Sequence, residues 1–240
     1  MPRFFTKSID ETKGVIVGDD AKHITKVLRM RPGEKLVACD TQGWDYDCVI
    51  EELNEKQVSL RVERAYPSET EPSVFVTLYQ AMPKSDKMEL IIQKAVELGV
   101  SAIVPVQTKR CVSRPDAKSM AKKQERYQRI ALEAAKQCGR GRIPQVLPML
   151  DYPQALDAMK KDRQAILFYE NSSCSFQEEL QTTASSLSIM VGAEGGFDEE
   201  EVRQALERGI ASISLGKRIL RCETAPLAAL SIIMYQTGNM

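Results

Sequence analysis

The feature that most constrains the fold of this chain is a change of pattern near residue 72. Between residues 14 and 66, apolar and polar residues alternate over short runs, whereas from residue 74 onward apolar runs alternate with segments of helical spacing. The stretch Tyr66–Pro72 contains two prolines and, besides them, no apolar residue after the tyrosine. Such a stretch is typical of a linker, so we expect two domains, residues 1–70 and 73–240.

The N-terminal pattern predicts a small antiparallel β-barrel or sandwich of about 65 residues. Turn-forming residues at Thr41–Gly43 and Leu53–Glu55 separate the later strands. The expected strands are Gly14–Val17, Glu34–Cys39, Tyr46–Ile50 and Gln57–Val62.

The C-terminal pattern predicts a largely parallel sheet with helices on both faces, because strands and helices alternate along it. In such α/β sheets, ligands bind at the carboxyl ends of the strands. The expected strands are Val74–Leu78, Ala102–Val106, Ala165–Tyr169, Leu187–Val191 and Ala211–Leu215. The expected helices are Lys87–Gly99, 117–138, Tyr152–Lys160, Phe176–Thr182, Asp198–Gly209 and Ala225–Tyr235.

Two of these helices have marked beginnings, and each follows an unusual loop. Asp198 with Glu201 forms a capping-box pattern, and Thr224 places a hydroxyl group before Ala225 and Pro226. The loop before the first helix, Val191–Phe197, has three glycines in five residues. Such a loop is either a tight connection or a place where backbone N–H groups approach a ligand.

The loop before the second helix, Leu215–Ala225, contains three basic residues and one acid around an apolar pair. It is either a surface loop with Ile219 and Leu220 in the core, or one wall of a ligand pocket. In the second interpretation the apolar pair lies against a flat ring, and the charged side chains face a polar substrate. Those charged side chains are Arg218, Arg221 and Glu223.

Charge is distributed unevenly, although 33 basic and 33 acidic residues balance over the chain. Residues 73–142 carry 14 basic and 6 acidic side chains, and nearly all of that surplus follows Lys109. The surplus indicates either a solvated helix face or a surface that contacts nucleic-acid phosphates. No apolar run has the length of a membrane span and no signal peptide is recognisable, so a cytoplasmic protein is expected.

Six cysteines without a Cys-x-x-Cys pair and a single histidine, His23, exclude a structural zinc site, and we expect no metal. They also exclude a histidine base beside a Ser or Cys nucleophile unless His23 is that base. We expect His23 to serve the fold or an RNA-binding surface.

Five motifs together resemble the bacterial 16S rRNA (uracil-N3)-methyltransferases of the SPOUT class. The segment His23–Gly33 also resembles the PUA-like barrel of that family, so the resemblance spans nearly the whole chain. Ala193 and Lys217 stand where the family commonly has proline, which costs loop rigidity rather than chemistry. The motifs are Lys84–Glu89, Gln93–Val100, Glu133–Gln137 with Arg140, Val191–Phe197 and Leu215–Ala225.

The resemblance implies a deep trefoil knot in the C-terminal domain and methyl transfer from S-adenosylmethionine to N3 of a uridine in the decoding region of 16S rRNA. Arg221, Glu223 and Arg218 are the implied catalytic residues: Glu223 accepts the N3 proton, and an arginine balances the charge on the uracil. The alternative is an Arg–Glu pair that only braces the loop. The implied cofactor site is formed by Gly192, Glu194, Gly195, Gly196, Leu215, Gly216, Ile219, Leu220, Thr224 and Ala225, beside the end of strand Ala165–Tyr169.

The resemblance further implies RNA contacts on both domains and a homodimer acting on the 30S subunit. The last helix, with Ile232, Ile233 and Met234, is apolar enough to form the dimer interface. Phosphates, which position RNA without reading its sequence, would be held by basic side chains. These are Arg3, Lys26, Arg29, Arg31, Arg110, Arg114, Arg140 and Arg142.

Three alternatives remain open. One is a catalytically silent RNA-binding or ribosome-assembly protein of the same fold, and another is a methyltransferase whose acceptor is ribose O2′ or a tRNA base. The third is a nucleotide-dependent α/β enzyme such as a dehydrogenase, which the missing Gly-x-Gly-x-x-Gly motif disfavours.

Overall fold

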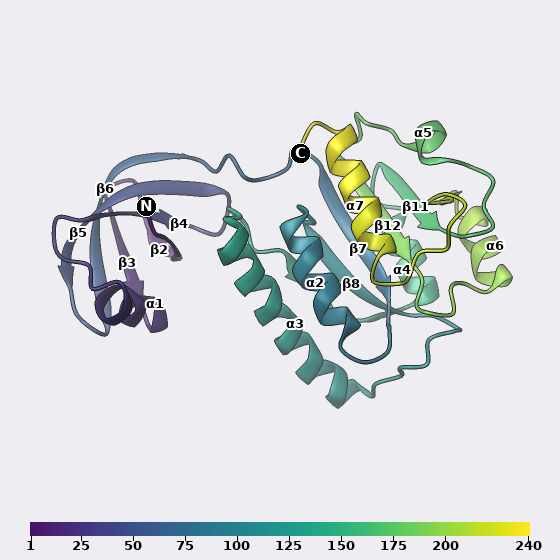
Figure 1. Cartoon of the computed structure of the whole chain (residues 1–240), viewed down its shortest axis with the longest axis horizontal. Helices are drawn as coiled ribbons and strands as arrows, with labels where there is room; N and C mark the ends of the chain where they lie inside the picture. Colours follow the sequence, from purple (N-terminus) through teal and green to yellow (C-terminus); the bar gives the residue numbers. More distant parts are fainter. The chain divides into compact units, whose positions relative to one another are not determined.

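The structure, a computed structural model, describes residues 1–240 except for the side chain of Ala117. Two compact units are present, shown in Figure 1. One consists of residues 1–71 with 135–143, and the other of residues 72–134 with 144–240. Residues 135–143 thus group with the N-terminal unit, although they lie inside the range 73–240.

The N-terminal unit is a six-stranded sheet in the order β1-β4-β5-β6-β3-β2. Its strand pairs are antiparallel apart from β1 with β4, which is parallel. The last strand extends through Pro67, so the sheet continues into the predicted linker. The elements are β1 (Arg3–Phe5), β2 (Ser8–Ile9), β3 (Lys13–Val17), α1 (Asp19–Lys22), the π-helical turn η1 (His23–Val27), β4 (Lys35–Cys39), β5 (Trp44–Leu53) and β6 (Gln57–Pro67).

Alternation of apolar and polar residues places one side of this sheet in a core of its own. Ile16 of β3, Leu36 of β4 and Leu60 of β6 are fully buried there, together with Ile24 of η1. His23 lies at the edge of this core, with its ring 6.0 Å from the ring of Phe4 in an edge-to-face arrangement.

Several contacts tie residues 135–143 to the N-terminal unit, and one carboxylate makes four of the hydrogen bonds. Glu71 accepts hydrogen bonds from Nε and Nη2 of Arg140, both at 2.9 Å. It also accepts the backbone N–H groups of Gly141 and Arg142, at 2.8 and 3.0 Å. Burial raises the pKa of Glu71, but the Arg140 guanidinium and these N–H groups bring it below its ordinary value.

The second unit is a parallel sheet in the order β10-β8-β7-β12-β11-β13, with β9 paired to β8. Every strand pair in it is parallel, as the alternation of strands and helices predicts. The strands are β7 (Phe75–Ala81), β8 (Ala102–Gln107), β9 (Gln145–Val146), β10 (Leu150–Asp151), β11 (Gln164–Phe168), β12 (Ser186–Val191) and β13 (Ala211–Ile213). The helices are α2 (Lys87–Glu97), α3 (Ala117–Cys138), α4 (Tyr152–Met159), α5 (Phe176–Glu179), α6 (Glu199–Glu207) and α7 (Ala225–Gln236).

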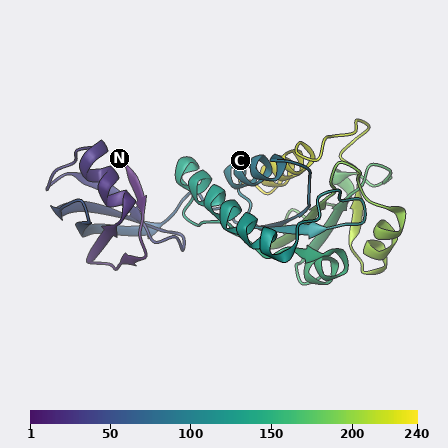
Figure 2. The same cartoon turned by 90° about the horizontal axis from the view of Figure 1, so that it is seen from below.

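Helices cover both faces of this sheet (Figures 1 and 2). On one face, α4 and α6 pack with apolar strand residues into a continuous core that includes Leu156 and Val202. On the other, α2 and α7 lie side by side. Gly99 follows the C-terminal end of α2 with a φ of 91° and lies beside Met234 of α7. A side chain at this position would strain the backbone and crowd Met234, which favours glycine there.

The packing of α7 corrects one expectation. Ile233 and Met234 are buried inside this chain, so they are not free to form a dimer interface, and Ile232 is the partly exposed residue of the three. No helix in the described part of the chain combines the length and apolar character needed to cross a membrane.

Candidate active site

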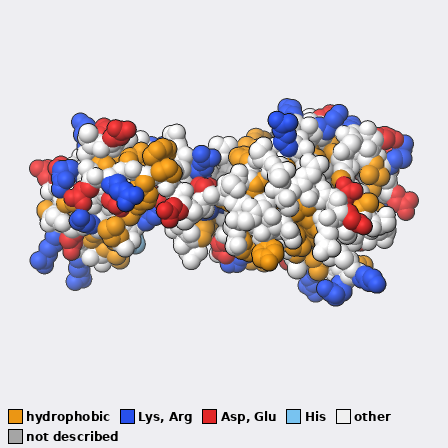
Figure 3. Space-filling view, turned by 90° about the horizontal axis from the view of Figure 1, so that it is seen from above, with side chains coloured by type: hydrophobic (Ala, Val, Ile, Leu, Met, Phe, Trp, Pro, Cys, Tyr) orange, Lys and Arg blue, Asp and Glu red, His pale blue; other side chains and the backbone are white. Residues whose placement is uncertain are grey.

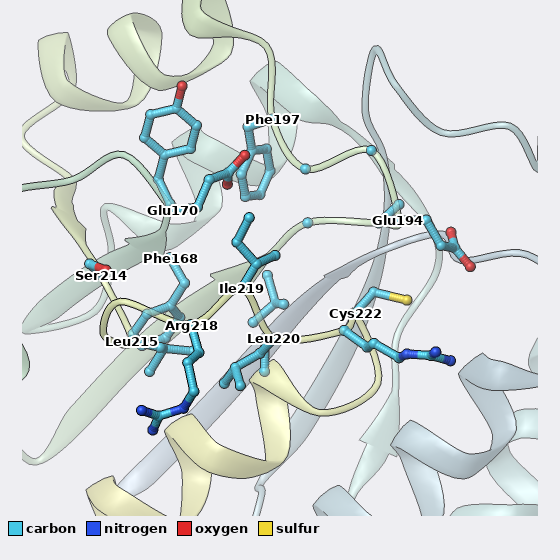
Figure 4. A pocket seen from close by; sticks show the side chains of 18 of the residues that line it. Phe168, Glu170, Glu194, Phe197, Ser214, Leu215, Arg218, Ile219, Leu220 and Cys222 are labelled. Atoms are coloured by element: carbon cyan, nitrogen blue, oxygen red, sulfur yellow. The ribbon is translucent and has the colours of Figure 1, made fainter.

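A cavity of about 550 Å³ lies at the carboxyl ends of β12, β11 and β13, three neighbouring strands (Figure 4). Three segments line it: residues 168–170 after β11, the glycine loop 191–197 after β12, and the C-terminal loop 214–225 after β13. Lys87 at the start of α2 also lines it. This is the edge at which parallel α/β sheets bind ligands.

The glycine loop folds tightly against the sheet. The N–H of Gly196 donates to the carbonyl of Ala193 at 3.0 Å, and Nε2 of the fully buried Gln80 donates to the carbonyl of Gly192 at 3.3 Å. Gly196 has a φ of 62°, and a Cβ there would lie 3.1 Å from a carboxylate oxygen of Glu170. The glycines therefore let the backbone reach the cavity without side chains in between.

The C-terminal loop directs an apolar side chain into the cavity. Figure 4 shows Ile219 extending toward Phe197 and Glu170, while Arg218 extends the other way. Ile219 is 84% exposed, so it is not part of the core, and its surface is open to a ligand. Among the described residues, the guanidinium groups of Arg218 and Arg221 have no ion-pair partner.

Glu223 is held by a lysine rather than by an arginine. Its Oε2 lies 3.2 Å from Nζ of Lys87, and the same ammonium lies 3.0 Å from Oε1 of Glu194 in the glycine loop. The thiol of Cys222 also donates to Glu223 at 3.2 Å, and burial raises the pKa of this thiol to about 12. The Cys222 hydrogen bond, a backbone N–H group and Lys87 keep the pKa of Glu223 below its ordinary value, so Glu223 is ionised at neutral pH.

The predicted pocket residues meet at this cavity. Two predicted residues are not on the lining: Thr224, one of the ten expected to contact a cofactor, and Glu223, which contacts Lys87 of the lining. The hydroxyl of Thr224 makes no capping hydrogen bond to α7. The capping box of Asp198 and Glu201 is present as expected. The lining includes Gly192, Glu194, Gly195, Gly196, Leu215, Gly216, Ile219, Leu220 and Ala225, with Arg218 and Arg221.

The predicted RNA-contacting side chains differ in their accessibility. Arg140 is 4% exposed and fixed on Glu71, so the structure contradicts a phosphate contact by its guanidinium. Arg3 is also engaged, with Asp45 at 2.7 Å and with the carbonyl of Arg140 at 2.8 Å. The other predicted residues are exposed: Lys26, Arg29, Arg31, Arg110, Arg114 and Arg142.

Basic side chains are present on the surface of both units. The face seen in Figure 3 carries Lys and Arg on each unit, interspersed with Asp and Glu. In the second unit, Arg110 donates to the carbonyl of Gly195 at 3.1 Å, which joins an exposed cation to the glycine loop. Arg114 donates to the carbonyls of Cys111 and Lys109.

Two contributors to the site escape prediction from the sequence. Lys87 lies within the motif Lys84–Glu89, but the motif does not indicate that its ammonium reaches Glu194 and Glu223. Gln80 is a polar residue near the end of an apolar strand, which is a signal for a specific hydrogen bond in a core. Within the described residues, no cluster of His, Cys, Asp and Glu could hold a metal ion.

Comparisons with known proteins agree with this architecture. An RNA methyltransferase domain matches residues 70–234, and an RNA methyltransferase PUA domain matches residues 16–63. The ribosomal RNA small subunit methyltransferase E of Bacillus subtilis is 38% identical over 231 residues, which cover 92% of this chain and 90% of that protein.

Solved structures match over the same extent. The ribosomal RNA small subunit methyltransferase E of Neisseria gonorrhoeae, bound to S-adenosyl methionine, has a TM-score of 0.86 at 34% identity and covers 98% of this chain and 97% of its own. A Legionella pneumophila protein in complex with the cofactor SAM has a TM-score of 0.85 at 30% identity, with coverage of 98% and 97%. The N-terminal half-barrel is thus a PUA domain, and the parallel sheet is that of a SPOUT methyltransferase. The chain belongs to the ribosomal RNA small subunit methyltransferase E family.

Proposed function

We propose that this chain transfers a methyl group from S-adenosylmethionine to N3 of a uridine in the decoding region of 16S rRNA, on the assembled small subunit. The observation that carries the proposal is the cavity at the carboxyl ends of β11, β12 and β13, with its glycine loop and its cations without partners. Family membership and the SAM-bound structures of relatives support the choice of cofactor.

The cavity suits a nucleoside cofactor. A volume of about 550 Å³ is within the range of small-molecule sites, roughly 300–1,000 Å³. The backbone of Gly192–Gly196 lines the cavity where the edge of an adenine would lie, and Ile219 and Leu220 supply an apolar wall for its face. The carboxylate of Glu170, at the end of β11, is exposed on the same lining and can accept hydrogen bonds from ribose hydroxyls.

When bound, S-adenosylmethionine supplies a methyl group activated by a sulfonium and leaves as the neutral thioether S-adenosylhomocysteine. The chain has to remove the proton from uridine N3, because the electron pair of the N–H bond becomes available for the new N–C bond only after the proton leaves. Glu223, ionised at neutral pH, accepts this proton directly or through water.

A carboxylate with a lowered pKa is a weak base for a uracil N–H group, so Glu223 needs help from fixed positive charge. Arg221 and Arg218 line the cavity without an ion-pair partner among the described residues. Their guanidinium groups can therefore balance the negative charge that spreads onto the uracil oxygens as the proton leaves. The alternative of an Arg–Glu brace receives no support here, because Glu223 pairs with Lys87.

RNA binding is divided between the two units. Exposed basic side chains on both units hold phosphates. These are Lys26, Arg29, Arg31 and Arg142 in the first unit, and Arg110 and Arg114 in the second. The target uridine has to leave its stack to expose N3. We further propose that the C-terminal loop passes through a trefoil knot and that two copies of the chain form a dimer.

Calorimetric titration with S-adenosylhomocysteine tests the cofactor, with NADH as the control. We expect saturable binding of the methionine-derived compound alone. Binding of NADH instead would contradict the proposal in favour of a nucleotide-dependent enzyme. If neither binds, including after addition of small subunits, a silent RNA-binding protein of the same fold is the better account. Methylation of a ribose or of tRNA would replace the proposed acceptor.

A further inference from the structure

The ammonium of Lys87 joins three segments at the edge of the cavity. Its Nζ lies 3.0 Å from Glu194, 3.2 Å from Glu223 and 3.8 Å from the sulfur of Cys222. The same Glu194 carboxylate accepts the backbone N–H of Lys84 at 3.1 Å. The turn before α2, the glycine loop and the C-terminal loop therefore meet at one cation.

The helix itself does not explain a lysine at this position. Lys87 is the first residue of α2, where the helix dipole favours an anion and disfavours a cation. Its side chain is 32% exposed, and the two carboxylates stabilise the charge that the helix terminus disfavours. The hydrogen bonds to Glu194 and Glu223 raise the pKa of Lys87, so it stays protonated.

Lys87 also contributes to the charge state of Glu223, beside the hydrogen bond from Cys222. In the described part of the chain, the titratable groups that contact Lys87 are Glu194, Glu223 and Cys222, and Cys222 is a neutral thiol. Without the ammonium, two carboxylates would face each other across the gap that it fills. Like charges at short range raise the pKa of a carboxylate, so part of Glu223 would be protonated and could accept no proton.

We propose that Lys87 is a positioning residue for methyl transfer: from the cavity lining it holds the Glu223 carboxylate ionised and links it to the glycine loop through Glu194. This inference rests on the proposed function, in which Glu223 accepts the N3 proton. Lys87 acts through Glu223, so its removal changes the pH dependence of the reaction as well as its rate.

The test is the single-turnover methylation rate on small subunits that lack the modification, measured between about pH 5.5 and about pH 8. Lys87→Met is compared with the wild type, with Lys87→Arg, and with Lys94→Met. Lys94 is the matched control because it lies on the same helix and pairs with Glu97 at 2.9 Å, away from the cavity.

We expect Lys87→Met to acquire an acid limb that the wild type lacks in this range. If the pKa of Glu223 rises to about half a unit above the acid end of this range, the rate there falls by about fourfold beyond any loss at pH 8. Lys87→Arg, which keeps the charge, and Lys94→Met keep the wild-type profile. The double variant Lys87→Met/Glu194→Gln regains most of the wild-type pH dependence, because the carboxylate that repels Glu223 is removed.

A merely structural tie gives a different pattern. Lys87→Met would then lose methylation rate equally at every pH, or lose S-adenosylhomocysteine binding. The pH dependence of the rate would be unchanged in both the single and the double variant, and the inference would be wrong. The pKa of Glu223, measured by NMR on carbon-13-labelled glutamate, is the second readout: it rises in Lys87→Met if the inference holds and stays unchanged if it does not. A wild type that leaves uridine N3 unmethylated would overturn the proposed function itself.

Discussion

Residues 140–142 and residues 218–221 each contain two arginines, and Arg140 of the first segment differs sharply from the pair in the second. In the first, Arg140 is buried and its guanidinium is held by both oxygens of Glu71. In the second, Arg218 and Arg221 line a cavity, and the nearby Glu223 pairs with Lys87 instead.

This difference separates a structural charge from a functional one. A buried ion pair with all its hydrogen bonds made has no capacity left for a ligand, and removing one partner leaves an uncompensated charge. An exposed cation beside a cavity costs little to keep and is available to bind an anion. Arginine-rich loops of similar composition can therefore have unrelated roles.

Glu71→Gln tests the structural role of the buried ion pair. It leaves Arg140 buried without its anion, and we expect a loss of about 3–5 kcal/mol in the free energy of unfolding of the N-terminal unit. Denaturant unfolding of the full chain measures it. Glu63→Gln is the control, since its pair with Lys35 is exposed and should cost less than about 1 kcal/mol. Equal losses in both variants would show that the Glu71–Arg140 pair is not structural.

The same pair has a defined pH dependence. Because the pKa of Glu71 is lowered in the folded chain, its stabilising contribution is complete above the ordinary value of 4.5 and is lost as the pH falls through the lowered value. The difference in stability between wild type and Glu71→Gln should therefore shrink below about pH 4.5. Unfolding of both proteins across this range checks it, and a difference that grows toward acid would contradict the assignment.

Glu223→Gln tests the functional side of the comparison. Removal of the proton acceptor should lower the single-turnover methylation rate by about 100-fold, while stability and S-adenosylhomocysteine affinity change little. Glu207→Gln, in an exposed pair with Arg203 on α6, is the control. Weakened binding with an unchanged single-turnover rate would exclude a proton-accepting role.

Gly196→Ala tests whether the glycine loop forms part of the cofactor site. The positive φ and the contact with Glu170 oppose any side chain there, so S-adenosylhomocysteine affinity should fall by about tenfold. Gly209→Ala is a matched control, because Gly209 also has a positive φ, of 77°, but lies after α6 with open space around its Cα. Equal effects of the two substitutions on affinity would show that the loop does not form the cofactor site.

The smallest expected effect comes from exposed cations of the N-terminal unit. Arg29→Ala with Arg31→Ala should weaken binding to small subunits and reduce the salt dependence of the binding constant by about one unit of log–log slope per lost phosphate contact. Arg203→Ala, an exposed arginine on α6, is the control. An unchanged slope would remove these residues from the RNA surface.

The fold could be predicted where periodicity is long. The periodicity predicts the 22-residue helix 117–138 and the parallel direction of the strands in the second unit. The Asp198–Glu201 capping box marks the start of α6. Strands of two or three residues, such as β2, leave no periodic signal. The grouping of residues 135–143 with the N-terminal unit involves contacts between residues far apart in the sequence, such as Glu71 and Arg140 at a separation of 69 positions, so no local pattern could show it.

The site could be predicted as a set of loops but not as a set of contacts. The motifs predict that the glycine loop and the C-terminal loop form one site, and Ile219 of the expected apolar wall lies on the cavity lining. The sequence could not show which cation holds Glu223, because Arg218, Arg221 and Lys87 all carry the same charge and only their distances differ. The sequence likewise could not show that Arg140, expected to contact phosphate, is buried against Glu71.

The most direct test of the account is mass-spectrometric mapping of 16S rRNA after small subunits lacking the modification are incubated with this protein and S-adenosylmethionine. We expect one added methyl group, on N3 of a single uridine in the decoding region, and an about 100-fold slower appearance of it when Glu223→Gln replaces the wild type. A methyl group on a ribose or on another base, or an unmodified rRNA with the wild-type protein, would contradict it.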